Sequence, residues 1–243
     1  MRRLLIPLTA VLLPADCLVC GRHLPAEHDG GVCLPCWKSF RRLEGACCRR
    51  CGDPVLAFED PVPRPSFLCD ECRRHPRPFE RCRSAGIYDG ALREAIHRVK
   101  FDGETALARS LGRFLARSLP GEAAEADLVA PVPLHPRKLR ERGFNQSEFL
   151  SRAVASAASL PHQPRLLSKT TPTHSQTGLG RRDRRRNLKG TFSLRTRTPV
   201  AGKRVLLVDD IYTTGCTVEE CARALRRAGA RAVRVLTLAR TIR

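Results

Sequence analysis

The chain has 243 residues, which is long enough for one full domain and a smaller second one. Its 44 lysine and arginine residues exceed its 24 acidic residues, and the resulting formal net charge of +20 favours anionic ligands or polyanions. Aromatic residues make up only 5% of the chain, so the composition does not indicate a protein that holds nucleic acids by base stacking.

The first thirteen residues combine two arginines with an apolar run, as a secretory signal does. However, Pro7 interrupts the run, no small-x-small cleavage site follows it, and Asp16 before Cys17 spoils a lipoprotein site. We therefore expect a short amphipathic helix that packs on the protein. No later stretch is long and apolar enough to span a bilayer, so we expect a cytoplasmic protein without an integral membrane segment.

Cysteines dominate the next part of the chain, where ten of the 12 lie between residues 17 and 82. Eight of them form four Cys-x-x-Cys pairs, with 12 residues between the first two pairs and 17 between the last two. Both spacings are typical of four thiolates around a tetrahedral zinc ion. The predicted ligands are Cys17, Cys20, Cys33 and Cys36 for one ion and Cys48, Cys51, Cys69 and Cys72 for the other.

The repeated pattern indicates an internal duplication with two structural zinc ions, because four thiolates leave no open coordination position for chemistry. A cross-braced module, in which the first pair shares its ion with the third, is the competing arrangement. A disulfide framework is disfavoured in an intracellular protein. Cys47 could replace Cys48, although the spacing to Cys51 favours Cys48, and Cys82 is left over.

Prolines at positions 61–65 and 76–78 mark the exit from this module, so we place a domain boundary near Arg83, with domains at 1–83 and 84–243. Residues 84–90 then predict an entry strand. Apolar residues at helical spacing follow in two groups and predict two amphipathic helices. They are Leu92, Ala95, Ile96 and Val99 in the first, which leads into Lys100-Phe101, and Leu107, Leu111, Phe114 and Leu115 in the second.

Residues 127–134 predict a buried strand, and a basic loop follows it. Ligands of open α/β sheets bind at the carboxyl ends of the strands, so this loop is a candidate anion site, although a solvated basic turn is the simpler alternative. The candidate contacts are Arg137, Lys138, Arg140, Arg142 and Asn145. A helix is expected next, with its buried stripe at Phe149, Leu150, Ala153, Val154 and Ala157.

Leu166-Leu167 predicts a short second strand, and residues 168–189 are then polar, with five arginines between 181 and 186. Such a long segment without apolar periodicity is usually functional or disordered. Its positive charge could bind an anionic ligand, bind a nucleic-acid backbone or simply be solvated. The candidate contacts are Gln176, Arg182 and Arg186.

Residues 190–194 predict another short strand, and Val205–Val208 predicts a strand buried on both faces that ends in an acidic pair, Asp209 and Asp210. Small hydroxyl residues and a glycine follow and leave backbone N–H groups open to an anion. They are Thr213, Thr214, Gly215, Cys216 and Thr217. Thr217 and Glu220 fit a capping box, so we expect a helix from here to Gly229, followed by a last strand at 233–238.

Residues 205–217 resemble the phosphoribosyl-pyrophosphate (PRPP) signature of type I phosphoribosyltransferases. The Pro-Val-Pro-Leu…Arg-Gly-Phe-Asn-Gln segment and the cysteine pairs extend this resemblance to the ComF/GntX family over the whole chain. The resemblance implies an α/β fold of the type I phosphoribosyltransferase class, which is Rossmann-like with a mostly parallel sheet and helices on both faces. It also implies that the N-terminal module is a double zinc ribbon.

The resemblance further implies how a ligand is held. The acidic pair at 209–210 would hold the ribose hydroxyls of PRPP, residues 213–217 its 5-phosphate, and the two basic segments its pyrophosphate together with Mg²⁺. Displacement of pyrophosphate needs positioning and charge stabilisation, so the lack of any catalytic acid or base motif is no objection.

Two functions remain open at this point. One is a ComF-like protein that binds PRPP, takes part in DNA uptake and natural transformation, and contacts single-stranded DNA through its zinc ribbons and arginine runs. The alternative is an active phosphoribosyltransferase of the nucleobase-salvage type with an unknown nitrogenous acceptor. Only a few residues follow Leu238 to build an acceptor site, so we favour the first.

Overall fold

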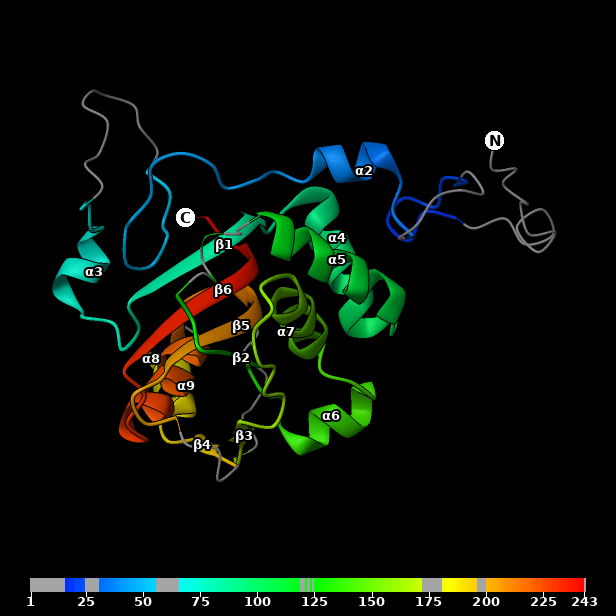
Figure 1. Ribbon diagram of the computed structural model, residues 1–243. Helices are drawn as coiled ribbons and strands as arrows, with labels where there is room; N and C mark the ends of the chain where they lie inside the picture. Colours follow the sequence, from blue (N-terminus) through cyan, green and yellow to red (C-terminus); the bar gives the residue numbers. More distant parts are fainter. Residues whose placement is uncertain are drawn as a thin grey trace.

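A computed structural model describes residues 16–24, 31–55, 66–118, 121, 123, 125–171, 181–195 and 200–242. Its centre is a four-stranded sheet in the order β1-β6-β5-β2, in which every neighbouring pair is parallel (Figure 1). The strands are β1 (Arg81–Ile87), β2 (Leu128–Pro131), β5 (Arg204–Tyr212) and β6 (Ala232–Arg240). The predicted parallel α/β architecture is confirmed.

The two faces of the sheet carry separate apolar cores because side chains alternate along β5. Leu206 and Val208 pack into one core, whereas Val205 and Leu207 pack into the other. A strand that is apolar on both faces must be covered on both, and helices lie on both sides in Figure 1.

Five helices provide most of this cover. The first core contains side chains from α4 (Gly90–Phe101), α5 (Thr105–Ser118) and α7 (Gln146–Ala157). The second contains side chains from α8 (Arg181–Leu188) and α9 (Cys216–Arg227). The apolar residues that predicted α4 and α5 are buried, whereas Ala157 of the stripe expected on α7 is exposed.

A second, two-stranded antiparallel sheet joins β3 (Leu167–Lys169) to β4 (Phe192–Leu194). The strand expected at Leu166-Leu167 therefore exists, but it pairs outside the main sheet. The arginine-rich run from 181 to 186 forms α8 rather than an irregular segment. Gln176 lies outside the described residues.

The cysteine-rich module packs on the α/β domain at two places. Trp37 of α2 (Leu34–Ser39) stacks on Phe114 of α5, with ring centroids 5.7 Å apart. The second cysteine group, of which Cys72 lies on α3 (Asp70–Arg74), belongs to the apolar core that also contains α9 side chains. Phe79 and Cys82 lie in the same core. The expected boundary at residue 83 falls inside β1, and it stays a prediction.

The helix expected over the first thirteen residues lies outside the described residues. Within the described ranges, no helix has the length and apolar character needed to cross a membrane.

Candidate functional site

The eight paired cysteines form two groups in which the sulfur atoms lie within 4.8 Å of one another. The groups follow the chain in sequence, as the spacing predicted, and not in the cross-braced order. None of the twelve cysteines, all of which lie within the described residues, forms a disulfide bond. Four sulfurs about 2.3 Å from a zinc ion lie about 3.8 Å apart in a tetrahedron, and the Sγ atoms of Cys51 and Cys69 are 3.6 Å apart. Both groups therefore suit a structural zinc ion.

Asp209 and Asp210 lie near the carboxyl end of β5. Neighbouring β2 ends at Pro131, which is opposite Val208, so the two carboxylates lie beyond the edge of that strand. Asp209 Oδ1 accepts hydrogen bonds from Ser147 Oγ at 3.0 Å and from the Asp210 amide at 2.9 Å. Both aspartates are buried, at 8% and 7% exposure, which marks them as a built site rather than a surface turn.

Asp210 is held by two further side chains. Its Oδ2 atom lies 2.7 Å from Lys100 Nζ and accepts a hydrogen bond from Gln146 Nε2 at 2.9 Å. Gln146 in turn accepts a hydrogen bond from Arg142 at 2.6 Å. The pair of carboxylates is thus linked to the last turn of α4, to the first residue of α7 and, through it, to the last residue of α6.

The two carboxyl groups have opposite pKa shifts. Burial, and next the charge of Asp210, raises the pKa of Asp209 to about 7. Burial also acts to raise the pKa of Asp210, but the Lys100 ammonium and the hydrogen bonds from Lys100 and Gln146 outweigh it, so this pKa lies below its usual value. Asp210 is therefore the more strongly ionised member of the pair.

The basic segment after β2 is a short helix, α6 (Pro136–Arg142), and not the expected loop. Pro136 at its first position and Gly143 at φ 81 after its last explain the ends. Lys138 and Arg142 line a cavity of about 420 Å³ together with Lys100, whereas Arg137 and Arg140 are exposed and do not line it.

Asn145 has a structural place next to this cavity. It is the N-cap of α7, where its side chain accepts a hydrogen bond from the Ser147 amide at 3.1 Å and donates one to the Val132 carbonyl at 3.0 Å. It therefore fixes the distance between the end of β2 and the start of α7, which carries Gln146 and Ser147.

The turn after β5 leads directly into α9. Gly215 is the N-cap at φ 80, without a side-chain cap, so the predicted capping box of Thr217 and Glu220 is wrong. Glu220 instead pairs with Arg223 and accepts a hydrogen bond from the Gly190 amide at 3.3 Å. The left-handed glycine turns the chain so that the first amides of a twelve-residue helix open toward the turn, which favours an anion there.

Comparisons with known proteins agree with this layout. Residues 8–73 match the double zinc ribbon domain and residues 155–242 match the phosphoribosyl transferase domain. DNA utilization protein YhgH of Salmonella typhimurium is 33% identical over 95% of this chain and 99% of its own length. The chain belongs to the ComF/GntX family.

Two other relatives extend this finding. Competence protein F of Haemophilus influenzae is 29% identical over 92% of this chain and 96% of its own, and competence protein ComFC of Streptococcus pneumoniae is 27% identical over 92% and 99%. A solved glutamine PRPP amidotransferase from B. subtilis is 27% identical, with a TM-score of 0.37, covering 54% of this chain and 25% of that one. The domain has the type I phosphoribosyltransferase fold, with zinc-ribbon cysteine groups before it.

The second zinc ribbon of this ComF-family chain is linked through Arg240 to Tyr212, which precedes the turn at residues 213–217. Arg240 is 3% exposed, donates to the Cys51 carbonyl at 2.8 Å and pairs with Asp53 at 2.5 Å. Its guanidinium carbon also lies 5.0 Å from the centroid of the Tyr212 ring. Tyr212 packs under Gly215, where an added Cβ would meet its hydroxyl at 2.3 Å.

Arg77 makes a second link between this ribbon and α9. Its side chain is 2% exposed and forms ion pairs with Glu219 of α9 and, at 3.6 Å, with Glu71 of α3. The helix that carries the zinc-ligand candidate Cys72 and helix α9 therefore share one buried guanidinium.

Sequence reasoning missed three residues around the aspartate pair: Lys100, Ser147 and Lys169. Burial, and next the charge of Lys138, lowers the pKa of Lys169, whereas the charge of Asp209 acts to raise it. Lys100 could have been noticed as a lysine that closes an otherwise apolar helical stripe. Lys169 carries no such signal, because β3 is placed by its pairing with β4.

The structure places on α8 the two arginines that were predicted as ligand contacts in the polar segment. Arg182 and Arg186 both lie on α8, and Arg186 is exposed. The described residues show no contact between Arg186 and either aspartate, so a role for these arginines at the ligand stays a prediction.

We expect Gly215→Ala to destabilise the protein by about 2 to 4 kcal/mol, since it adds a left-handed φ penalty and a clash with Tyr212. Gly202→Ala is the matched control, because Gly202 has φ 74 and nothing within 4 Å of an added Cβ. Chemical denaturation gives the loss in free energy of unfolding for each variant, and the difference between the two losses measures the cost of the clash with Tyr212. Equal losses would show that Tyr212 does not constrain the turn.

The raised pKa of Asp209 predicts a pH-dependent stability. The folded pKa of about 7 lies above the unfolded value, so this group lowers stability as pH rises toward about 7. Asp209→Asn removes that loss, so its free energy of unfolding should gain on that of wild type between about pH 4 and about pH 7. Glu44→Gln, at an exposed carboxylate, is the control; a gain that does not grow with pH would contradict the assignment.

Proposed function

We propose that this ComF-family chain binds PRPP at the carboxyl end of β5 and takes part in DNA uptake, where it contacts single-stranded DNA. One observation carries the proposal: the buried pair Asp209–Asp210 directly precedes a left-handed glycine turn at the amino end of α9. A vicinal diol fits the acidic pair and a phosphate fits the turn, and PRPP contains both groups on one ribose.

The residues divide the ligand between them. Asp209 and Asp210 would accept hydrogen bonds from the two ribose hydroxyls, as carboxylates accept strongly from hydroxyl donors. The amides and hydroxyls of residues 213–217 would hold the 5-phosphate. Thr213 is exposed and Thr214 and Thr217 are half-buried, so their hydroxyls are accessible, while Cys216 is buried and accepts a hydrogen bond from Thr214 at 3.2 Å.

The pyrophosphate would lie over the cavity beside α6. Lys138, Arg142 and Lys100 line that cavity together with the carboxylates of Asp102 and Glu141, and Lys100 also pairs with Asp210. Bound Mg²⁺ would neutralise part of the pyrophosphate charge. Arg137 and Arg140 from α6, and Gln176, Arg182 and Arg186 from the polar segment, are the outer candidates.

The role in DNA uptake is supported by the relatives, which are named as competence proteins and DNA utilization proteins and match this chain over nearly its whole length. The net charge of +20 supports contact with a polyanion. Neither observation requires turnover of PRPP.

A pyrophosphate-release assay with PRPP, Mg²⁺ and a panel of nucleobases distinguishes the two functions. We expect PRPP to raise the melting temperature without release of pyrophosphate for any base. Labelled single-stranded DNA should bind in parallel, and its affinity should fall steeply with salt. Turnover with one base would establish the transferase instead, and failure of both ligands to bind would refute the proposal.

A further inference from the structure

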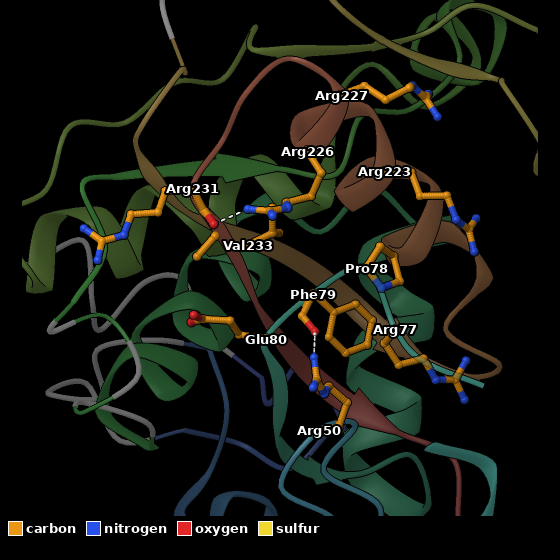
Figure 2. A pocket seen from close by; sticks show the side chains of 11 residues that line it. Arg50, Arg77, Pro78, Phe79, Glu80, Arg223, Arg226, Arg227, Arg231 and Val233 are labelled. Carbon is orange, nitrogen blue, oxygen red and sulfur yellow. Dashed lines mark hydrogen bonds between the residues drawn. The ribbon is translucent and has the colours of Figure 1, made fainter. Parts of the chain in front are cut away.

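A second basic cavity lies away from the ribose site, between the start of β1 and the carboxyl half of α9 (Figure 2). It measures about 620 Å³, and its charged lining is almost entirely arginine. Six arginines and a single carboxylate, Glu80, contribute to it. The arginines are Arg50, Arg77, Arg223, Arg226, Arg227 and Arg231.

Two of these arginines are neutralised inside the protein. Arg77 pairs with Glu219, and Arg223 pairs with Glu219 and Glu220. Glu80, the only acid in the lining, pairs with Arg234 at 3.0 Å. The acids near the cavity are therefore already occupied.

The other four arginines, Arg50, Arg226, Arg227 and Arg231, form no ion pair with a carboxylate among the described residues. Arg50 donates to the Phe79 carbonyl at 2.9 Å and Arg226 donates to the Ala230 carbonyl at 2.6 Å, which orients both guanidinium groups without neutralising them. Arg227 and Arg231 are exposed, and no carboxylate among the described residues pairs with either. In Figure 2 Arg50 and Arg226 point inward, whereas Arg227 and Arg231 extend outward in opposite directions.

The cavity continues into a neighbouring one. A cavity of about 680 Å³ shares Arg223 and Arg227 with the first, and it extends to His75 and to Lys189 at the end of α8. The two form one basic track that runs from the zinc ribbon along α9 toward the arginine-rich helix α8. A compact anion would fill only one end of such a track, so its length favours an extended polyanion.

The track lies at the other end of the sheet from the ribose site. Ala232 and Val233, which begin β6, line it, whereas Asp209 and Asp210 lie near the carboxyl end of β5. Along α9, Arg226 is ten residues from Cys216, or about 15 Å at the rise of an α-helix. Phe79, the sole aromatic residue in the lining, is 1% exposed and offers no stacking surface.

We propose that this track, defined by Arg50, Arg223, Arg226, Arg227, Arg231 and Lys189, binds the phosphodiester backbone of single-stranded DNA without reading its sequence. The inference rests on the DNA contact in the proposed function and places that contact on α9 and the second zinc ribbon. Guanidinium groups suit phosphate oxygens, and the lack of an exposed Phe, Tyr or Trp ring in the lining predicts similar affinity for different bases.

Fluorescence anisotropy of a labelled oligo-dT in about 0.1 M salt tests the proposal with Arg227→Gln plus Arg231→Gln. Neither side chain has an ion pair to lose, so the variant should fold as wild type does. Two lost phosphate contacts should weaken binding roughly 20-fold and lower the salt slope by about 1.4. Arg93→Gln plus Arg117→Gln, at exposed arginines on α4 and α5, makes the same charge change and should weaken binding less than about 3-fold.

The possible outcomes distinguish a failure of DNA binding at the track from a failure of the proposed function. Equal affinities of the track variant and the control would overturn it, and loss on Arg182→Gln plus Arg186→Gln alone would place DNA on α8 instead. If the variant keeps DNA binding but loses thermal stabilisation by tripolyphosphate, the track is a small-anion site and the proposal fails. If wild type binds no DNA, the DNA contact of the proposed function fails with it. PRPP binding by the track variant should equal that of wild type.

Discussion

Replacing both signature aspartates, with Asp209→Asn and Asp210→Asn, is expected to weaken PRPP binding by at least about 100-fold. Each carboxylate that accepts from a ribose hydroxyl makes a charge-assisted bond of about 1.5 to 3 kcal/mol, and two such losses exceed a factor of 100. Asparagine keeps the size of the side chain, and the Ser147 hydroxyl can still donate to it. Titration of both proteins with PRPP in Mg²⁺ measures the loss.

The control for this pair is Glu44→Gln with Glu94→Gln, which removes the same charge from two exposed carboxylates. It should leave PRPP affinity within about 3-fold of wild type, because exposed charges beyond a Debye length are screened. DNA binding should survive in both variants. If the aspartate variant binds PRPP as tightly as the control does, the acidic pair is not the ribose site.

The second large effect concerns the zinc ribbons, which should not be equivalent. Cys72→Ser removes a ligand of the second ribbon, whose Arg77 and Arg240 contacts reach α9 and Tyr212. We expect one zinc ion per chain instead of two, a melting temperature lower by about 10 °C or more, and PRPP binding weaker by about 10-fold or more.

Cys36→Ser is the matched change in the first ribbon. That ribbon packs through Trp37 on α5, away from the phosphate turn, so zinc content should fall equally while PRPP affinity changes less than about 3-fold. Metal analysis, thermal melting and PRPP titration on both variants provide the comparison. Equal losses of PRPP affinity would show that Arg77 and Arg240 do not transmit the state of the second ribbon to the turn.

The predictable parts of this protein are encoded in short stretches of chain. A Cys-x-x-Cys pair forms one turn that presents two sulfurs whatever surrounds it, so the two cysteine groups followed from spacing. The apolar run at 205–208 is buried on both faces, and its acids emerge where a parallel strand ends. Left-handed Gly229 after α9 also followed from local chemistry.

The missed parts depend on contacts between distant segments. Lys100 and Asp210 are 110 positions apart in the sequence. They meet only because α4 and β5 pack into the same apolar core. The capping box failed because Gly215 already turns the chain and Glu220 is drawn to Arg223. The arginine track escaped notice because its members come from the second zinc ribbon, α9, the turn before β6 and the residue after α8, and no single run of sequence contains them.

Calorimetric titration of the zinc-loaded wild-type protein with PRPP in Mg²⁺, alongside ribose 5-phosphate and pyrophosphate, tests the central claim most directly. A site that holds the ribose hydroxyls, the 5-phosphate and the pyrophosphate together should bind one PRPP per chain and bind each fragment at least about 10-fold more weakly. Pyrophosphate that binds as tightly as PRPP would contradict a ribose site at Asp209 and Asp210. Absence of heat with PRPP for a folded protein carrying two zinc ions would contradict the account as a whole.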